Sequence, residues 1–169
     1  MPGSERRWLR DSLRAFLLPA FERLGFQVVP LSKEDASSRA ISSAFPFGSL
    51  RRQSEHGLEI VEIQLDKRQR PTFRINMGIA PPEGVEHPIA GHISQGDLDV
   101  HSLRQSFELY QIAFIRRWFS ARSYFGRAPS ESDYEELAKR VVGLIPEVEA
   151  TLREGTKRGR HVRSVVRWR

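Results

Sequence analysis

The sequence predicts an α+β fold, in which an antiparallel β-meander of three to four strands packs against an N-terminal and a C-terminal helix. Three patterns predict it: amphipathic helical periodicity near each end of the chain, and alternation of apolar and polar residues in its centre. With 169 residues, 39% hydrophobic and 28% charged, the chain has the size and composition of one globular domain. We expect that domain to span residues 1–155 and residues 156–169 to form a basic C-terminal tail.

Residues 5–24 have the periodicity of an amphipathic helix, with arginines on the side opposite the apolar positions. Pro19 lacks the N–H that a helix interior uses, so we expect a kink there. Gly25 is typical of a left-handed helix cap. The apolar positions are Leu9, Leu13, Phe16, Leu17, Ala20 and Leu24.

The segment that follows is predicted to be mostly irregular. Residues 26–29 have an extended pattern, whereas residues 32–43 are rich in Ser, Ala and charge without a clear period. We therefore expect a loop over residues 32–43. A strand is predicted near residues 47–53, joined to the central hairpin by a turn over residues 54–57.

The centre of the chain is predicted to form a β-hairpin from residues 58–66 and 72–79, joined by five polar or turn-forming residues. If Asp66 pairs with Thr72, the alternating apolar residues of the two strands all lie on one face of the hairpin, as a correct register requires. The apolar pairs are Val61 with Met77, Ile63 with Ile75 and Leu65 with Phe73; the polar pairs are Glu62 with Asn76 and Gln64 with Arg74.

The second half of the chain contains one ambiguous element and one clear element. Residues 85–102 are predicted to form a long loop, and a fourth strand is expected around residues 107–113. The clear element is a C-terminal helix that ends at Gly155 and kinks at Pro146. Its N-terminus has two overlapping capping-box patterns, Ser130 with Asp133 and Ser132 with Glu135.

Composition excludes several functional classes. The chain has no cysteine, which excludes a disulfide scaffold, a thiolate zinc site and a cysteine nucleophile, and we therefore expect a cytoplasmic location. No stretch reaches the roughly 18 apolar residues that a membrane-spanning helix needs, so no membrane association is expected. Glu5, Asp11 and Pro19 argue against reading the N-terminus as a targeting segment.

Several short stretches resemble an uncharacterised bacterial family, the domain of unknown function 4304. These stretches are Leu24-Gly25-Phe26, Glu62-Ile63-Gln64 with Asp66-Lys67, Asn76-Met77-Gly78-Ile79 with Pro81-Pro82-Glu83-Gly84, Trp118-Phe119, and Pro146-Glu147-Val148-Glu149. The resemblance covers most of the chain from the first helix to the last. It implies helices packed against an antiparallel meander, and it implies no activity and no catalytic residues.

The polar face of the hairpin is the first candidate binding surface. Glu62, Gln64, Arg74 and Asn76 would place a carboxylate, a guanidinium and two amides on one rigid face, where they could bind a partner by directional hydrogen bonds. The alternative is that this is the ordinary solvated face of an antiparallel sheet.

The loop over residues 86–101 contains three histidines, His87, His92 and His101, together with acidic residues. Such residues could hold zinc or iron in a metal-dependent hydrolase. Their spacing matches no metal motif, and the sequence has no nucleophile elbow, phosphate loop or dinucleotide fingerprint. We therefore expect no metal and no cofactor, and an enzymatic activity is the less favoured interpretation.

The basic tail is the second candidate surface. Six of the 27 basic residues follow Glu154, so the other 21 balance the 21 acidic residues of the chain. Arg163, Arg167 and Trp168 could bind a nucleic-acid backbone weakly and stack on a base. The alternatives are that the tail binds an acidic protein, docks onto the acidic C-terminal helix, or has no specific role. The leading hypothesis is a non-catalytic module that binds a protein partner, with a nucleic-acid-associated accessory protein as the alternative.

Overall fold

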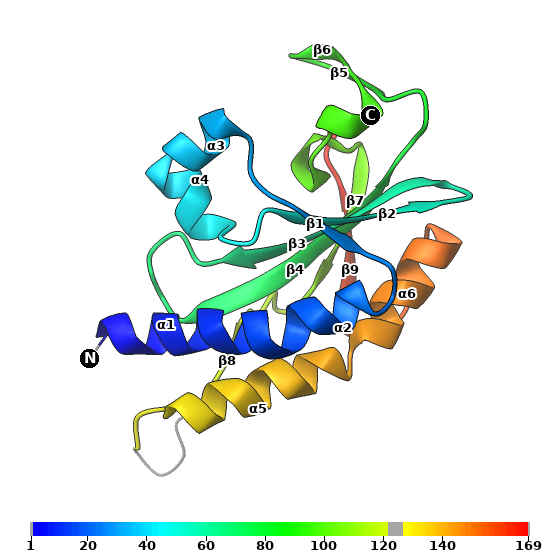
Figure 1. The fold of residues 1–169 in the computed structure, drawn as a ribbon. Helices are drawn as coiled ribbons and strands as arrows, with labels where there is room; N and C mark the ends of the chain where they lie inside the picture. The colour runs from blue at the N-terminus through cyan, green and yellow to red at the C-terminus, as the bar shows by residue number, and fades with distance from the viewer. Residues whose placement is uncertain (1, 122–126, 169) are drawn as a thin grey trace.

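The computed structural model describes residues 2–121 and 127–168. An antiparallel sheet in the order β1-β2-β3-β4-β7-β9, with β8 paired to β4, has the long N-terminal helix and the C-terminal helices on one side (Figure 1). The predicted α+β fold is therefore confirmed, with a larger sheet than the sequence indicates. The main strands are β1 (Gln27–Val29), β2 (Ser49–Ser54), β3 (Gly57–Leu65), β4 (Thr72–Ala80), β7 (Gln105–Leu109), β8 (Phe119–Ser120) and β9 (Val162–Val166).

The N-terminal helix is continuous from α1 (Pro2–Ser12) through a π-helical turn at Leu13–Leu17 to α2 (Leu18–Glu22). The expected disturbance at Pro19 takes the form of this π turn, in which the Leu18 N–H bonds the Leu13 carbonyl instead of the usual partner. Gly25 has a φ of 89° and ends the helical segment, as predicted.

Residues 32–43, predicted to be a loop, instead form two short helices, α3 (Lys33–Ser37) and α4 (Arg39–Ala44). Ser32 and Ser38 cap their N-termini, since each side chain accepts a backbone N–H three residues later. Helices of five and six residues are too short to show helical periodicity, so the sequence pattern missed them.

The register of the central hairpin is confirmed at every predicted pair. Its apolar face packs against the helices, and Val61, Ile63, Leu65, Phe73, Ile75 and Met77 are all buried in the main core. On the opposite face, residues 94–104 lie across the sheet and enclose a smaller apolar cluster around Ile60, Leu98 and Leu103. Gly78 permits this close approach, because a Cβ there would lie 2.4 Å from Leu103 Cδ1.

Residues 85–102, predicted to be a loop, contain a small hairpin and two single-turn 3₁₀ helices. The hairpin pairs β5 (Val85–His87) with β6 (Gly91–Ile93), and the 3₁₀ turns are η2 (Gln95–Asp97) and η3 (Val100–Ser102). The expected fourth strand exists as β7, which ends at Leu109 rather than at residue 113.

The C-terminal helix is divided at residues 143–144 into α5 (Glu131–Val142) and α6 (Ile145–Glu154), so the kink expected at Pro146 falls just before it. Ser130 with Asp133 forms the capping box, and Gly155 ends α6 in the left-handed conformation. None of the helices in the described part of the chain has the length and apolar content that crossing a bilayer requires.

Residues 156–169 were expected to form a tail outside the domain, and the structure corrects this boundary. Residues 162–166 form β9, which pairs with β7, and Val162 is fully buried in the main core. The connecting segment is held against α6, because the Glu147 carboxylate accepts the backbone N–H of His161 at 3.0 Å and contacts its Nδ1 at 2.7 Å. Docking onto the acidic C-terminal helix, one of the alternatives for the tail, is thus what residues 158–161 do.

Candidate functional site

The polar face of the hairpin is buried rather than solvated. Glu62 and Gln64 are each 5% exposed and Asn76 is 0% exposed. The 94–104 segment covers Glu62, since the Val100 N–H donates to Glu62 Oε1 at 3.1 Å. These three predicted partner-binding residues are therefore shielded from direct contact with a macromolecule.

Hydrogen bonds join the polar residues into a network that continues onto β7. Gln64 Oε1 accepts from Arg74 Nε at 3.1 Å and from Asn76 Nδ2 at 2.9 Å. Glu108 lies opposite Asn76 in the sheet, and its carboxylate forms an ion pair with Arg74 at 2.9 Å.

Tyr110 completes this network. Its hydroxyl donates to Glu108 Oε2 at 2.6 Å and accepts from Arg74 Nη1 at 2.8 Å. Burial and the hydrogen bond to Glu108 raise the pKa of Tyr110 despite the nearby Arg74 charge. The phenol therefore stays neutral and rigidly oriented, and it fixes the guanidinium of Arg74 in place.

One end of the polar network opens into a cavity of about 460 Å³ between α3–α4 and residues 96–101. Glu62 and His101 both line it, with His101 Nδ1 3.6 Å from Glu62 Oε2. This Glu62 oxygen is buried and has no hydrogen-bond partner among the described residues. The lining mixes apolar residues such as Ile41 and Phe45 with charged residues of both signs, and its volume is in the range of small-molecule sites.

The other end of the network opens into a hollow of about 450 Å³ beside β9. Arg74 lies there with its guanidinium carbon 5.0 Å from the Trp118 ring centre. Arg163 from β9 lines the same hollow, as does Arg116 from the loop between β7 and β8. Two residues proposed from separate parts of the sequence, Arg74 and Arg163, are thus brought together.

The remaining two predicted residues lie elsewhere. Trp168 packs its ring edge to face with His87, with 4.8 Å between the ring centres. Arg167 has buried Nε and Nη2 atoms that find no partner in the described chain. The Trp168 ring thus contacts a side chain of the same domain, and base stacking by Trp168 stays a prediction.

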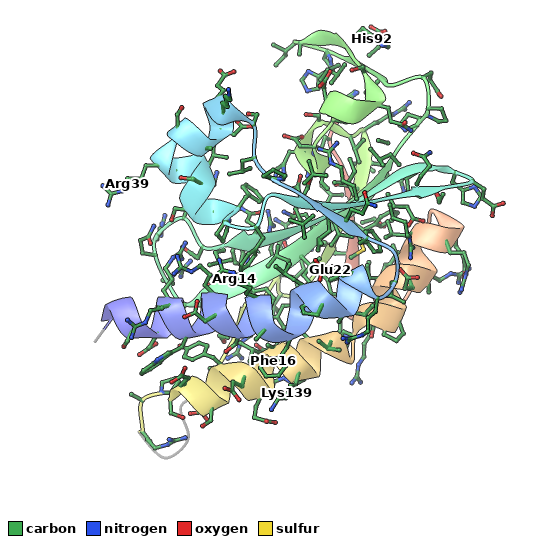
Figure 2. All side chains as sticks on the ribbon, viewed as in Figure 1. Arg14, Phe16, Glu22, Arg39, His92 and Lys139 are labelled. Atoms are coloured by element: carbon green, nitrogen blue, oxygen red, sulfur yellow. The ribbon has the colours of Figure 1, made fainter. Side chains whose placement is uncertain are left out.

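The three histidines of the predicted loop do not converge. His92 lies at the tip of the β5–β6 hairpin and contacts Glu86 at 2.6 Å (Figure 2), whereas His101 lies against Phe45 and Glu62. Among the described residues, no group of three or more His, Asp or Glu side chains could hold a metal ion. The geometry therefore gives no support to the metal-dependent hydrolase.

Sequence reasoning missed Glu108 and Tyr110, which are central to the network. Their signal was present, because Ser106, Glu108 and Tyr110 alternate with Phe107 and Leu109 at the period of a strand. The pattern over residues 107–113 predicts a strand but does not by itself indicate which of its faces is polar.

Comparison of the chain with protein-family models, curated proteins and solved structures finds no match. The resemblance to the domain of unknown function 4304 therefore stays a prediction from short stretches of sequence.

Proposed function

We propose that this chain is a non-catalytic interaction module that binds an extended, acidic segment of a partner protein along β9. The observation that carries the proposal is an open sheet edge beside two arginines that form no ion pair among the described residues, Arg116 and Arg163. An extended peptide that adds to a sheet edge gains affinity from backbone hydrogen bonds and specificity from neighbouring side chains.

The direction of the peptide groups in β9 supports this mode of binding. The Tyr110 N–H donates to the His161 carbonyl, and the Arg167 N–H donates to the Arg104 carbonyl. Since hydrogen-bonded pairs alternate in an antiparallel ladder, the backbone groups of Arg163 and Val165 also face β7. Those of Val162, Ser164 and Val166 point away from the sheet, where no described strand pairs with them.

The side chains around this edge favour an acidic partner with apolar residues. Arg163 and Arg116 would attract carboxylates, because Glu108 in the same hollow is already paired with Arg74. Apolar groups are also exposed nearby: Val166 on β9 is 63% exposed, and Phe114 in the 112–117 loop is 92% exposed. An alternating sequence of acidic and apolar residues would match both features.

Ser164→Pro tests the proposal, because it removes an outward N–H and leaves the ladder with β7 intact. The probe is a set of labelled nine-residue peptides with Glu and Val at alternate positions, measured by fluorescence anisotropy. We expect binding to the unchanged chain and to Ser164→Ala, and its loss in Ser164→Pro, with circular dichroism showing that all three fold alike.

The Arg163→Glu variant separates edge pairing from simple charge attraction. We expect it to weaken binding of the acidic peptides and to leave peptides with Lys in place of Glu unaffected or better bound. Equal binding by Ser164→Pro and Ser164→Ala, or no peptide binding to the unchanged chain, would overturn the proposed function.

The cavity at Glu62 supports a second candidate function, the binding of a small molecule that carries an ammonium group. The observation that favours it is the unpartnered Glu62 Oε2, since a buried carboxylate oxygen without a donor is costly to maintain. His101 Nδ1 lies 3.6 Å from this oxygen, so an ammonium group that binds the oxygen would also contact or displace the His101 ring. Titrating a panel of primary amines by NMR, with Glu62→Gln as the matched variant, tests this candidate: chemical-shift changes around His101 should vanish in the variant.

A further inference from the structure

A separate basic hollow lies between the start of α1, α4 and the β3–β4 turn. Figure 1 shows these three segments on the same side of the molecule. Its volume is about 580 Å³. Its lining contains four arginines and no carboxylate. The arginines are Arg6, Arg7, Arg10 and Arg39.

Arg6 builds the floor of this hollow by joining three segments of the chain. Its Nη1 donates to the carbonyls of Asp66 and Arg70 at 2.9 and 3.2 Å, and its Nη2 donates to the Ser43 carbonyl at 2.7 Å. Gln69 Nε2 donates to the hydroxyl of Ser43 at 2.7 Å. The shape of the hollow is therefore held by hydrogen bonds.

The guanidinium groups around the hollow are poorly neutralised. Among the described residues, Arg7 and Arg39 form no ion pair, and Figure 2 shows Arg39 extending outward from α4. Arg10 has only a long contact with Asp11, at 3.9 Å. Burial lowers the pKa of Arg6; the nearby Asp66 charge opposes this shift, and the charge of Arg10 adds to it.

We propose that this hollow binds adjacent phosphate groups of a small polyphosphorylated molecule. Arginine guanidinium groups fit phosphate oxygens with paired hydrogen bonds, and several of them around one hollow suit a compact polyanion. The volume lies in the range of small-molecule sites. No aromatic ring lines the hollow, so it lacks the stacking surface on which single-stranded nucleic acids depend.

This basic surface is not visible in the charge count of the sequence. Residues 1–155 are formally neutral, which argues against a broad nucleic-acid-binding face on the body of the domain and gives no sign of a local basic site. The fold separates the charges in space, since it gathers arginines from α1 and α4 on one side and leaves many acidic residues on α5 and α6. Arg6 is committed to the fold, so Arg7 and Arg39 are the residues to test.

The test measures binding of inorganic tripolyphosphate to the full chain by isothermal titration calorimetry at two salt concentrations. We expect salt-sensitive binding, and Arg7→Gln with Arg39→Gln should raise the Kd about tenfold or more, because each lost charge-assisted contact is worth roughly that factor. The matched control is Arg153→Gln with Arg160→Gln, which removes the same charge from exposed positions on α6 and in the segment that follows it. Figure 1 shows α6 far from the start of α1. This control should change the Kd by less than about twofold, the effect expected of screened distant charges.

The same titration with a twelve-nucleotide oligothymidylate distinguishes the source of the phosphates. The proposal requires tripolyphosphate to bind more tightly than the oligonucleotide. Three results would overturn it: no tripolyphosphate binding at low salt, equal losses in the two double variants, or tighter binding of the oligonucleotide that depends on Arg7 and Arg39. The outcome is independent of the β9 edge, since neither arginine lies near it.

Discussion

The two faces of the central hairpin come from the same strands and are buried in different ways. On one face, Ile63 and Ile75 pack among the helices with no polar atom to satisfy. On the other face, Glu62 and Asn76 are equally buried, yet Glu62 Oε2 and Asn76 Oδ1 lack partners among the described residues. Burial alone therefore does not distinguish a stabilising face from a functional one.

The difference indicates what each face contributes. Apolar burial lowers the free energy of the folded chain almost regardless of detail. Buried polar groups contribute only when every donor and acceptor is satisfied, and groups left unsatisfied weaken the fold. A sheet that keeps unpartnered polar atoms on one face is expected to be strained there and to accept a ligand or a movement of the covering segment.

Removing residues 156–169 should have the largest effect, because β9 contributes to both faces. The truncated chain loses the burial of Val162, worth about 1.5–3 kcal/mol, and several ladder hydrogen bonds of about 0.5–1.5 kcal/mol each. Chemical denaturation followed by circular dichroism should show a large drop in the midpoint, whereas removing only residues 167–169 should cost much less. An unchanged midpoint in the longer truncation would mean that the sheet folds without β9.

Ile75→Ala tests the apolar face. Ile75 is fully buried between β4 and the helices, so the variant should lower the free energy of unfolding by about 2–5 kcal/mol, the usual range for such a cavity. Urea denaturation measures this value. If Ile75→Ala lowers the free energy of unfolding by less than Tyr110→Phe does, the apolar face is not the main source of stability.

Tyr110→Phe tests the satisfied part of the polar network. Loss of the hydroxyl leaves Glu108 and Arg74 each without one hydrogen bond, so we expect a cost of about 1–3 kcal/mol at neutral pH. The raised pKa of Tyr110 means that the folded chain keeps its proton when the unfolded chain loses it, above pH 10.0. The stability that the Tyr110 hydroxyl contributes is therefore present below pH 10.0 and is lost as the pH rises above it. In denaturation curves measured at alkaline pH, the difference in free energy of unfolding between the unchanged chain and Tyr110→Phe should therefore become smaller.

Ser106→Ala should have the smallest effect on stability. It tests the buried polar groups that have no hydrogen-bond partner among the described residues. Ser106 is fully buried and its hydroxyl finds no partner among the described residues. Removing it should change the free energy of unfolding by less than about 0.5 kcal/mol, or raise it, because an unsatisfied group is removed. A loss above about 1 kcal/mol would show that the hydroxyl has a hydrogen bond in solution.

Much of the candidate site could be predicted locally, and its environment could not. The register of the hairpin follows from the alternation of residues 60–66 and 72–78, so the side-by-side positions of Gln64 and Arg74 were predictable. The burial of Glu62 depends on residues 94–104, since the Val100 N–H donates to its carboxylate, and those residues have no periodic pattern that would indicate a packed cover. The pairing of Arg74 with Glu108 joins segments 34 residues apart, and no local rule connects them.

By itself, the sequence determined the α+β class, the central register, the apolar core face and the ends of the C-terminal helix. Each of these depends on periodicity or on residues such as Gly155 and Pro146 that restrict the backbone locally. Only the tertiary structure decided that the basic C-terminal segment is an edge strand, that the polar face is covered, and that Arg7 and Arg39 share a hollow. These features depend on contacts between distant segments, whose free energies are set by packing, burial and charge in three dimensions.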